Sequence, residues 1–398
     1  MKSNANLAKV GGTDSIVAQS LPDRARALFD LIDAEAENIE RSGTVTEPVV
    51  TALKDSGIFD MMLPRELGGS DVDVLTALEV FEEITRANVA AGWVALVNAT
   101  VAASAATYVS DEAAQQIFGD GKAILAGAFS AGGGTIKPTE GGYIFEGRFR
   151  FGSGIGHANW VAGNAPVLDE AGEPLLGPGG IPLRRIVFVP RDKVELRGNW
   201  GDVMGLKGSG SYDFDVVETF VPEGFTFLLN GDEVKRNKPL GHFGVGGLIA
   251  IGQAGFPLGA AQRALDEIRA MAPKRARMGH SEPIGNQQMF QYGYAFHESA
   301  LEAARSHVRD IFAKTAAYAA EHDAPPPVAD YLRLNQATCY AHRVAMEVIR
   351  FCFSWAGSQA IHPCALERIF RDMETANQHL FYDNMNFVRR TQFLLMAA

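Results

Sequence analysis

The order of three sequence patterns along the 398-residue chain limits its fold more than any other feature. From residue 22 to 120, apolar residues recur at spacings of three and four, the period of an amphipathic helix. Residues 121–232 are instead rich in glycine, aromatic and β-branched residues, with short alternating runs such as GYIFEGRFRF that predict strands. The helical period returns over residues 233–398. The chain is therefore predicted to be an α+β multidomain protein with a helical domain, a β domain and a second helical domain.

Charge and cysteine content narrow the class of partner. Lys and Arg total 36 against 47 Asp and Glu, and the formal net charge of −11 disfavours nucleic acid and anionic membranes as partners. The three cysteines, Cys339, Cys352 and Cys364, are widely spaced and lack metal-ligand spacing, so we expect free thiols in a cytoplasmic protein and no metal. Residues 1–15 lack the apolar core of a signal peptide. The most apolar stretch, 244–261, is interrupted by glycines and is predicted to be a core helix rather than a membrane span.

One strand-like run ends in an unusual way. Arg148 to Phe151 alternate polar with apolar residues, and Gly152-Ser153-Gly154 then removes side chains where the strand pattern stops. Ser153 could cap a turn, as serines among glycines usually do. Alternatively, the bare backbone could let a flat ligand approach its hydroxyl.

The sequence lacks the glycine-rich motif of a Rossmann dinucleotide-binding site. No G-x-G-x-x-G opens a helix after a strand, and Gly132-Gly133-Gly134 is predicted to be a turn between strands. A Rossmann site for reduced nicotinamide is therefore not expected.

Three longer motifs carry a family resemblance. MLPRELGGSDVD from residue 62, MGLKGSGSYDFDVVETFVP at 204–222 and WAGSQAIHPCALERIFRD at 355–372 resemble the acyl-CoA dehydrogenase superfamily in order and spacing. The resemblance implies an N-terminal helical domain, a central β-barrel domain, a C-terminal four-helix bundle and a homotetramer. The F-x-SG-x-x-H run at 151–157 most resembles the flavin-dependent monooxygenases of this superfamily, including two-component aromatic hydroxylases.

The residue that would act as base in a dehydrogenase is absent. Acyl-CoA dehydrogenases carry a glutamate eight residues after the aspartate of the RD motif, and counting from Asp372 that place is Leu380. Glu374 and Asp383 are close in sequence but would point elsewhere on a helix. Because some members place their base on another helix, a dehydrogenase with a displaced base stays open as an alternative, as does a non-catalytic relative.

Two residues take the catalytic roles if the resemblance to the monooxygenases holds. His379 lies where that branch carries a histidine facing the flavin, and an imidazole of ordinary pKa, about 6.5, could hold the proton of a flavin C4a-hydroperoxide. Ser153 would lie beside flavin N5 and slow the loss of peroxide. His379 could equally be a core histidine, and His157 of the same motif could orient the loop or contact substrate.

The substrate-binding residues are the least defined. Related hydroxylases place a histidine in the helix after a GWV-like motif, and residues 91–109 contain none, so the substrate stays open. The resemblance makes Trp93 and Phe129 walls of the pocket, and Asn98 could donate a hydrogen bond there. By composition alone all three could be core or interface residues.

The remaining assignments concern the flavin phosphate. Arg275 or Arg277 in KRARMGHSEPIGNQQ would bind it, often across a subunit interface, although a basic helix end is an equal interpretation. Ser209, Ser211, Gly357 and Ser358 occupy the other family positions that approach the flavin or its phosphate. The prediction as a whole is a monooxygenase that uses reduced FMN or FAD, delivered by a separate flavin reductase, to oxygenate an aromatic or heteroaromatic small molecule.

Overall fold

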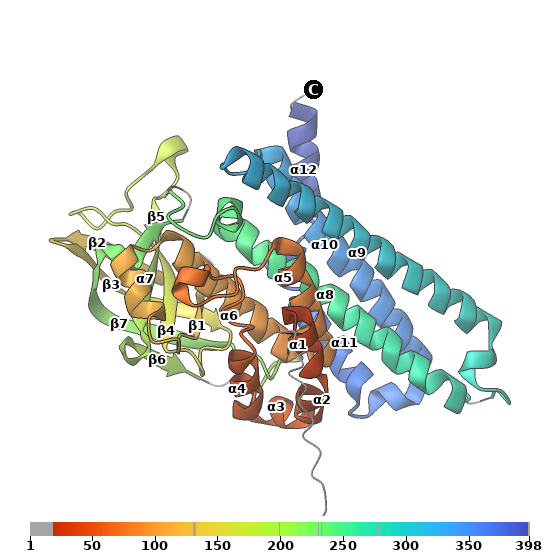
Figure 1. Cartoon of the computed structure of the whole chain (residues 1–398). Coiled ribbons are helices and arrows are strands. Elements are labelled where there is room, and N and C mark those ends of the chain that lie inside the picture. Colours follow the sequence, from red (N-terminus) through yellow and green to blue (C-terminus); the bar gives the residue numbers. More distant parts are fainter. Residues whose placement is uncertain are drawn as a thin grey trace, which may run out of the picture.

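The computed structural model describes residues 19–129, 133–198, 200–229, 231, 233–277 and 279–396. It contains helices, then two sheets, then helices again, in the order that the sequence patterns predict (Figure 1). Gly132 and residues 1–15 lie outside the described residues. The domain limits at 120 and 232 stay a prediction, although the described elements change from helix to strand between Phe118 and Leu125.

The N-terminal part is built from seven helices in the described chain. They are α1 Leu21–Ala27, α2 Phe29–Ala34, α3 Ala36–Ser42, α4 Glu47–Asp55, α5 Val74–Ala87, α6 Val89–Tyr108 and α7 Asp111–Phe118. Asn88 separates α5 from α6 because its side chain accepts the backbone N–H of Ala91 and so caps the second helix. The continuous helical pattern over 76–109 is therefore two helices.

The middle part contains two four-stranded sheets. The strands are β1 Leu125–Ala128, β2 Gly133–Thr139, β3 Gly142–Gly152, β4 Trp160–Pro166, β5 Arg184–Pro190, β6 Val194–Arg197, β7 Tyr212–Pro222 and β8 Thr226–Leu228. Their orders are β1-β4-β5-β8 and β2-β3-β7-β6, with β1 and β4 parallel and the other neighbours antiparallel. A Cβ at Gly163 of β4 would lie 2.7 Å from the ring of Phe145 of β3, so the sheets pack face to face.

Two local expectations about this part were wrong. Gly133 and Gly134 begin β2 and pair with β3 instead of forming a turn. Position 134 suits glycine because a side chain there would meet the ring of Phe149 at 2.4 Å. Phe149 is fully buried as the alternation predicts, but Phe151 is 54% exposed. The β3–β7 register shifts between Phe149 and Gly152, and Phe151 takes a left-handed backbone with φ of 63°.

The C-terminal part consists of long helices. They are α8 Gly244–Met271, α9 Gln288–His322, α10 Val328–Ala356, α11 Ala365–Ala376 and α12 Met385–Met396. Helices α8, α9 and α10 run side by side, and α12 projects from the body with the C-terminus at its far end (Figure 1). The three prolines at 325–327 lie in the turn between α9 and α10.

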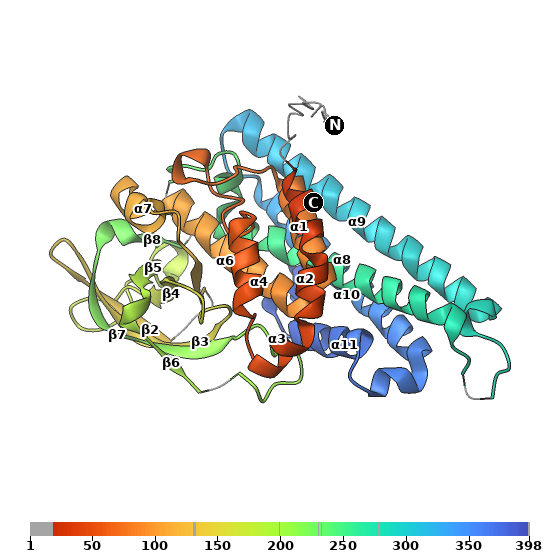
Figure 2. The ribbon, with the colours of Figure 1, turned by 60° about the horizontal axis from the view of Figure 1, so that its bottom comes forward.

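The two helical parts share one hydrophobic core. Helix α6 contacts β1 on one side and α8 on the other, so it lies between the sheets and the C-terminal helices (Figure 2). The stretches Val89–Tyr108 and Leu240–Lys274 are apolar and long enough to span a membrane by composition, but 94% and 83% of their most apolar windows are buried inside the protein. Burial on this scale is what core helices show.

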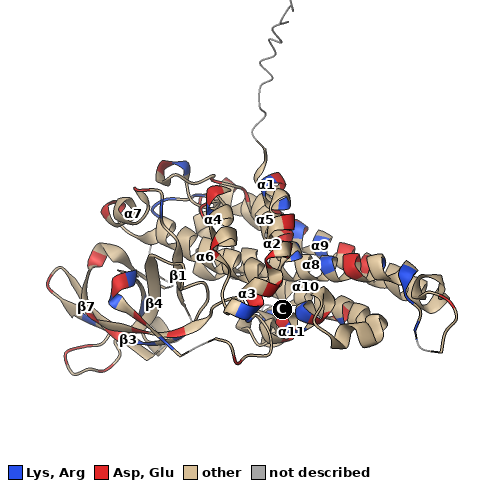
Figure 3. Cartoon of the chain, turned by 90° about the horizontal axis from the view of Figure 1, so that it is seen from below, with Lys and Arg blue, Asp and Glu red and all other residues tan. Residues whose placement is uncertain are grey.

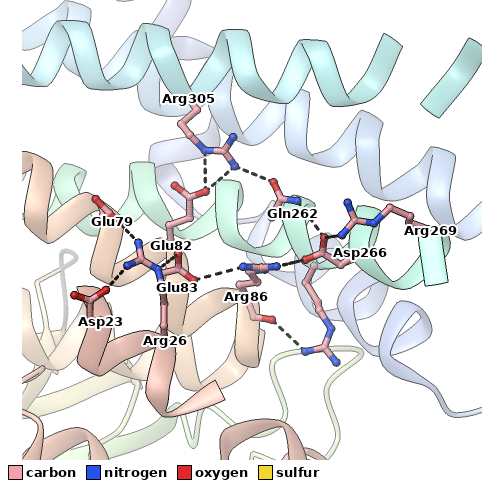
Figure 4. A network of polar contacts seen from close by, with 11 residues as sticks. Asp23, Arg26, Glu79, Glu82, Glu83, Arg86, Gln262, Asp266, Arg269 and Arg305 are labelled. Atoms are coloured by element: carbon pink, nitrogen blue, oxygen red, sulfur yellow. Dashed lines mark hydrogen bonds and ion pairs between the residues drawn. The ribbon is translucent and has the colours of Figure 1, made fainter. Parts of the chain in front are cut away.

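Ion pairs also connect the N-terminal helices to the C-terminal ones (Figure 4). Arg86 of α5 pairs with Asp266 of α8 at 2.7 Å, and Arg305 of α9 pairs with Glu82 of α5 at 2.7 Å. Burial raises the pKa of Glu82 despite that partner. Along the ribbon in Figure 3, positions with Lys or Arg are interspersed with positions that carry Asp or Glu.

The cysteine side chains form no disulfide with one another. Cys339, Cys352 and Cys364 are free, and the first two are buried. Within the described residues no group of three or more His, Cys, Asp or Glu side chains could hold a metal ion.

Candidate active site

A ladder of four hydrogen-bonded side chains lies where the strand β3 meets the helix α6. The indole Nε1–H of Trp93 donates to Ser153 Oγ at 3.0 Å, Ser153 Oγ lies 2.6 Å from Ser211 Oγ, and Ser211 Oγ lies 2.6 Å from Ser209 Oγ. All four residues are buried. We call Trp93, Ser153, Ser211 and Ser209 the hydroxyl ladder. Ser153 does sit in a turn, but its hydroxyl bonds to these side chains and not to the turn's backbone.

The glycine after Ser153 makes the close approach of helix and loop possible. Gly154 has φ of 69°, and a Cβ there would lie 2.8 Å from Asn98 Oδ1 and 3.1 Å from Val94 Cγ1 of α6. Its backbone N–H donates to the carbonyl of Ser209 at 2.9 Å. A larger residue would push the turn, and Ser153 with it, away from the helix.

The loop that carries Ser209 and Ser211 is held by the RD motif. The buried carboxylate of Asp372 accepts the backbone N–H of Leu206 at 2.6 Å, and Arg371 donates to the carbonyl of Met204 at 3.1 Å. A Cβ at Gly205 would collide with the Arg371 carbonyl at 2.0 Å, so the loop lies directly on α11. Burial raises the pKa of Asp372 to about 7.

His379 lies on the other side of Trp93 from Ser153. Its ring packs edge-on against the indole with centroids 5.3 Å apart, which brings the two predicted catalytic residues to one side chain. His379 Nδ1 accepts the backbone N–H of Phe381 at 3.5 Å, so the neutral ring carries its proton on Nε2. Burial lowers the pKa of His379 to about 4, against the ordinary value expected from sequence. The imidazole is therefore neutral at pH 7.

The acidic residues nearest in sequence to His379 are engaged elsewhere. Glu374 accepts from Arg350 Nε and Nη2 at 3.1 and 2.8 Å. Asp383 accepts the backbone N–H of Met385 at 2.8 Å, at the start of α12. Leu380, at the position of the dehydrogenase base, is 57% exposed and carries no ionisable group.

A cavity of about 420 Å³ opens beside His379. Helix α10 and the turn after α11 line it, with Arg343, Glu347 and Arg350 on one side and Leu380 near His379. The lining is polar, with charges of both signs. It gives His379 an approach from solvent.

A second polar group lies behind His379 and was not predicted from the sequence. His342 of α10 stacks on Tyr382 with centroids 3.7 Å apart, and its Nε2 lies 3.1 Å from Asn377 Oδ1. Tyr382 in turn donates to the carbonyl of Gln253 in α8 at 3.1 Å. These contacts fix the turn on which His379 stands.

Three of the candidate substrate contacts take other partners. Asn98 Nδ2 donates to the carbonyl of Leu125 at 2.6 Å, so the free atom of the amide is the acceptor Oδ1 and not the donor that was expected. His157 Nε2 lies 3.0 Å from Thr44 Oγ1, and burial lowers the pKa of His157. Phe129 is partly buried against the core of the sheets. His157 therefore joins the loop after β3 to Thr44, and of the two expected pocket walls Trp93 belongs to the ladder.

The predicted phosphate residues form a separate group at the end of α10. The guanidinium of Arg277 lies 4.7 Å from the centre of the Trp355 ring and donates to the carbonyl of Ser354. Gly357 and Ser358 follow directly. Gly357 has φ of 59° with open space where a Cβ would stand, and Ser358 is exposed. Arg275 is also exposed. We call Arg275, Arg277, Gly357 and Ser358 the basic rim.

The helix–sheet–helix architecture and the site between α6, β3 and the turn after α11 define an acyl-CoA dehydrogenase-like enzyme fold. Residues 18–120 match the family described as "Acyl-CoA dehydrogenase, N-terminal domain" and residues 251–384 match "Acyl-CoA dehydrogenase, C-terminal domain". The chain belongs to the acyl-CoA dehydrogenase family.

The relatives of similar sequence are oxygenases. An indole-3-acetate monooxygenase of Pseudomonas putida is 27% identical over 392 residues, covering 94% of this chain and 95% of that protein. The oxygenase subunit HsaA of a flavin-dependent monooxygenase from Rhodococcus jostii is 26% identical over 200 residues, 50% of each chain.

Solved structures share the fold over nearly the whole chain. XiaF from Streptomyces sp., in complex with FADH2 and glycerol, superposes with a TM-score of 0.82 at 22% identity, covering 93% of each chain. TdsC from Paenibacillus sp. A11-2, in complex with FMN and indole, gives a TM-score of 0.79 at 18% identity, covering 95% of this chain and 97% of that one. These likenesses confirm the predicted fold.

Proposed function

We propose that the chain is the oxygenase component of a two-component flavin-dependent monooxygenase. It takes reduced FMN or FAD from a separate flavin reductase and oxygenates an aromatic or heteroaromatic small molecule. When bound, reduced flavin supplies the two electrons with which one atom of dioxygen passes to the substrate and the other leaves as water. The names of the relatives, and the flavins bound in the similar structures, support this assignment.

The single observation that carries the proposal is the composition of the site around Trp93. It offers the hydroxyl of Ser153 and the neutral imidazole of His379, which both contact Trp93. Glu374 is paired with Arg350, and Asp383 lines the cavity beside His379 but accepts the backbone N–H of Met385. An acyl-CoA dehydrogenase needs a carboxylate to remove a proton next to the thioester carbonyl. A hydroxyl and an imidazole suit the protection and proton transfer that oxygen chemistry requires.

The residues fit a flavin in two places. The hydroxyl ladder offers buried polar groups to the edge of the ring, and the basic rim offers Arg275 and Arg277 to a phosphate. Because the basic rim is exposed on this chain, we propose that it serves the flavin of a neighbouring subunit in a cytoplasmic homotetramer. Exposed apolar side chains on the outer face of α9, at Met289, Tyr292 and Phe296, support burial against another copy.

The role of His379 follows from its protonation state. Neutral at pH 7, it can donate a hydrogen bond from Nε2 into the site, while its Nδ1 accepts from the backbone of Phe381. Ser153 would offer its hydroxyl to the edge of a bound flavin ring, where one hydrogen bond is worth about 1 kcal/mol net. His157 supports the loop through Thr44 and takes no part in the chemistry.

The deciding experiment uses the purified protein with chemically reduced FMN or FAD, mixed with oxygenated buffer in the absence of substrate. We expect hydrogen peroxide to appear more slowly than from free reduced flavin, and catechol- or hydroxyindole-type products to form when a phenol or an indole is added. Peroxide release at the free-flavin rate would count against the proposal. Bleaching of an oxidised-flavin complex by an acyl-CoA would instead establish a dehydrogenase.

A further inference from the structure

His342 is a buried residue of α10 whose imidazole contacts both ends of the turn that carries His379. Its Nε2 lies 3.1 Å from Oδ1 of Asn377, which stands two residues before His379. Its ring stacks on Tyr382, three residues after His379, with centroids 3.7 Å apart and planes at 11°. One side chain thus touches the start and the end of this turn.

The protonation state of His342 follows from its surroundings. Within the described chain its Nδ1 is buried and has no hydrogen-bond partner, and Asn377 Oδ1 can only accept. The neutral ring therefore carries its proton on Nε2 and donates it to Asn377. Burial lowers the pKa of His342 to about 3, so the ring is neutral at pH 7 and adds no charge beside His379.

The two ends of the turn are held to different degrees. The Tyr382 hydroxyl donates to the carbonyl of Gln253 at 3.1 Å, and the Tyr382 carbonyl accepts from Cys339 Sγ at 3.3 Å. Asn377 is exposed, and among the described residues its side chain bonds to His342 alone. The start of the turn therefore depends on the His342 hydrogen bond, whereas the end has anchors besides the ring stack.

We propose that His342 is a positioning residue for His379, and that it acts through its hydrogen bond to Asn377. The bond keeps the turn against α10, so that the His379 ring stays packed on Trp93 and its Nε2–H keeps one direction. If the turn moved away from α10, solvent would reach His379 from the cavity that Asn377 and His379 both line. The inference deepens the proposed function, on which it rests, by naming the residue that orients the proposed proton donor.

The test follows the pKa of His379 by NMR in the whole chain without flavin, using isotope-labelled histidine. The His379 signal is assigned by its absence in His379→Ala. His342→Phe keeps a flat ring on Tyr382 but cannot donate to Asn377, so the pKa of His379 should rise from about 4 to about 5 as water gains access. His342→Gln keeps an N–H at a similar reach. It should leave the pKa of His379 unchanged, although it loses the ring stack and some thermal stability.

The other charged groups of the cavity do not change between these variants. Arg343, Glu347, Arg350 and Asp383 line it in every case, and His342 is neutral at the pH where His379 titrates. A shift in the pKa of His379 would therefore report its position and its access to solvent, and not the loss of a neighbouring charge.

Asn377→Ala removes the acceptor and should raise the pKa of His379 as His342→Phe does. Because Asn377 is exposed, this variant also provides the test if His342→Phe does not fold. The double variant should show no further rise, since the two residues share one hydrogen bond. A matched control is His297→Phe on α9, which keeps a flat ring on Phe351 and loses an imidazole hydrogen bond within its helix. It should leave the pKa of His379 unchanged.

The inference is overturned if His342→Phe and Asn377→Ala leave the pKa of His379 unchanged. It is also overturned if His342→Gln raises that pKa as much as His342→Phe, or if the effects add in the double variant. The titration needs no flavin, so its outcome is independent of oxygenation. If it follows the prediction but bound reduced FMN releases peroxide at the free-flavin rate, the proposed function fails while the positioning of His379 stands.

Discussion

The hydroxyl ladder and the basic rim are both assigned to flavin, yet one chain builds them to different degrees. Every member of the ladder is buried and has its partner within the chain, from Trp93 through Ser153 to Ser209. Of the rim, Ser358 and Arg275 are exposed, whereas Arg277 packs over the ring of Trp355 and donates to the carbonyl of Ser354. The contrast agrees with our proposal that the ring site forms on folding and that the phosphate site is completed when subunits assemble.

The two regions should therefore respond differently to change. A substitution in the ladder or beside it acts on a preorganised site and should alter the chemistry at any protein concentration. A substitution in the rim should alter affinity, and should matter most when subunits are associated. The following predictions test this division, beginning with the largest effect.

Replacing His379 should have the greatest effect on turnover. His379→Ala removes the group that holds the proton in the site, and we expect product formation to fall about a hundredfold, the usual contribution of a general acid–base residue. Product and peroxide are measured together. Peroxide should rise as product falls, because electrons are still consumed. His307→Ala, which changes a histidine packed on Tyr340 of α10, is the control. If His379→Ala formed product and peroxide in the same ratio as the unchanged protein, His379 would have no role in the mechanism.

The pH dependence of that role follows from burial. The folded-state pKa of His379, about 4, lies below its unfolded value, so the folded protein binds fewer protons between them. The stability contribution is present above about pH 6.5 and is lost as pH falls toward 4. Because His379 stays neutral over this range, we expect its titration to add no pH dependence to the turnover rate between pH 6 and 8. A rate that follows a pKa near 6.5 and loses that limb in His379→Ala would contradict it.

Asp372 tests whether the ladder depends on the loop that α11 supports. Asp372→Ala leaves the Leu206 N–H without its acceptor and should lower the free energy of unfolding by about 2–3 kcal/mol. Asp372→Asn keeps an oxygen there. Because the folded pKa, about 7, is raised above the unfolded value, the wild-type contribution is lost as pH rises through 7. Between pH 5 and pH 8, the stability measured by thermal unfolding should fall less in Asp372→Asn than in the unchanged protein. An equal fall in both proteins would contradict this account.

Much of the fold could be predicted from the sequence, because helix and strand periods are local. The order of the blocks was right, and Asn88, which breaks the long helical pattern, was visible as a capping residue. Phe151 could not be foreseen, since its outward turn depends on a register shift against β7. The alternation of polar and apolar residues alone would place the Phe151 side chain in the core.

The candidate site, like the fold, could be predicted only in part from the sequence. The residue types at Ser153 and His379 were found through motifs, but their meeting point, the indole of Trp93, joins positions 60 residues apart in sequence and needs the tertiary fold. The lowered pKa of His379 likewise comes from packing. The role of Asp372 had a signal, because a carboxylate in an apolar helix face needs a partner.

In the basic rim, Arg277→Ala should weaken flavin binding about tenfold, since it removes a charged hydrogen-bonding group. Dilution of the unchanged protein should mimic this loss as subunits separate, which analytical ultracentrifugation can follow. Arg269→Ala, on an exposed arginine paired with Asp266, is the control. If Arg277→Ala bound flavin with unchanged affinity, the flavin phosphate would have to bind elsewhere.

The smallest effect is expected at Glu374, which lies between the two regions on α11. Glu374→Gln breaks a partly exposed ion pair with Arg350, and such pairs contribute about 0–1 kcal/mol. Oxygenation and peroxide release should stay at the unchanged level, as measured beside His379→Ala. If Glu374 were a displaced dehydrogenase base, Glu374→Gln would lose activity, because an amide cannot accept the proton. If Glu374→Gln abolished activity toward any substrate, the carboxylate would belong to the site, and the division between a hydroxyl–imidazole interior and a charged exterior would fail.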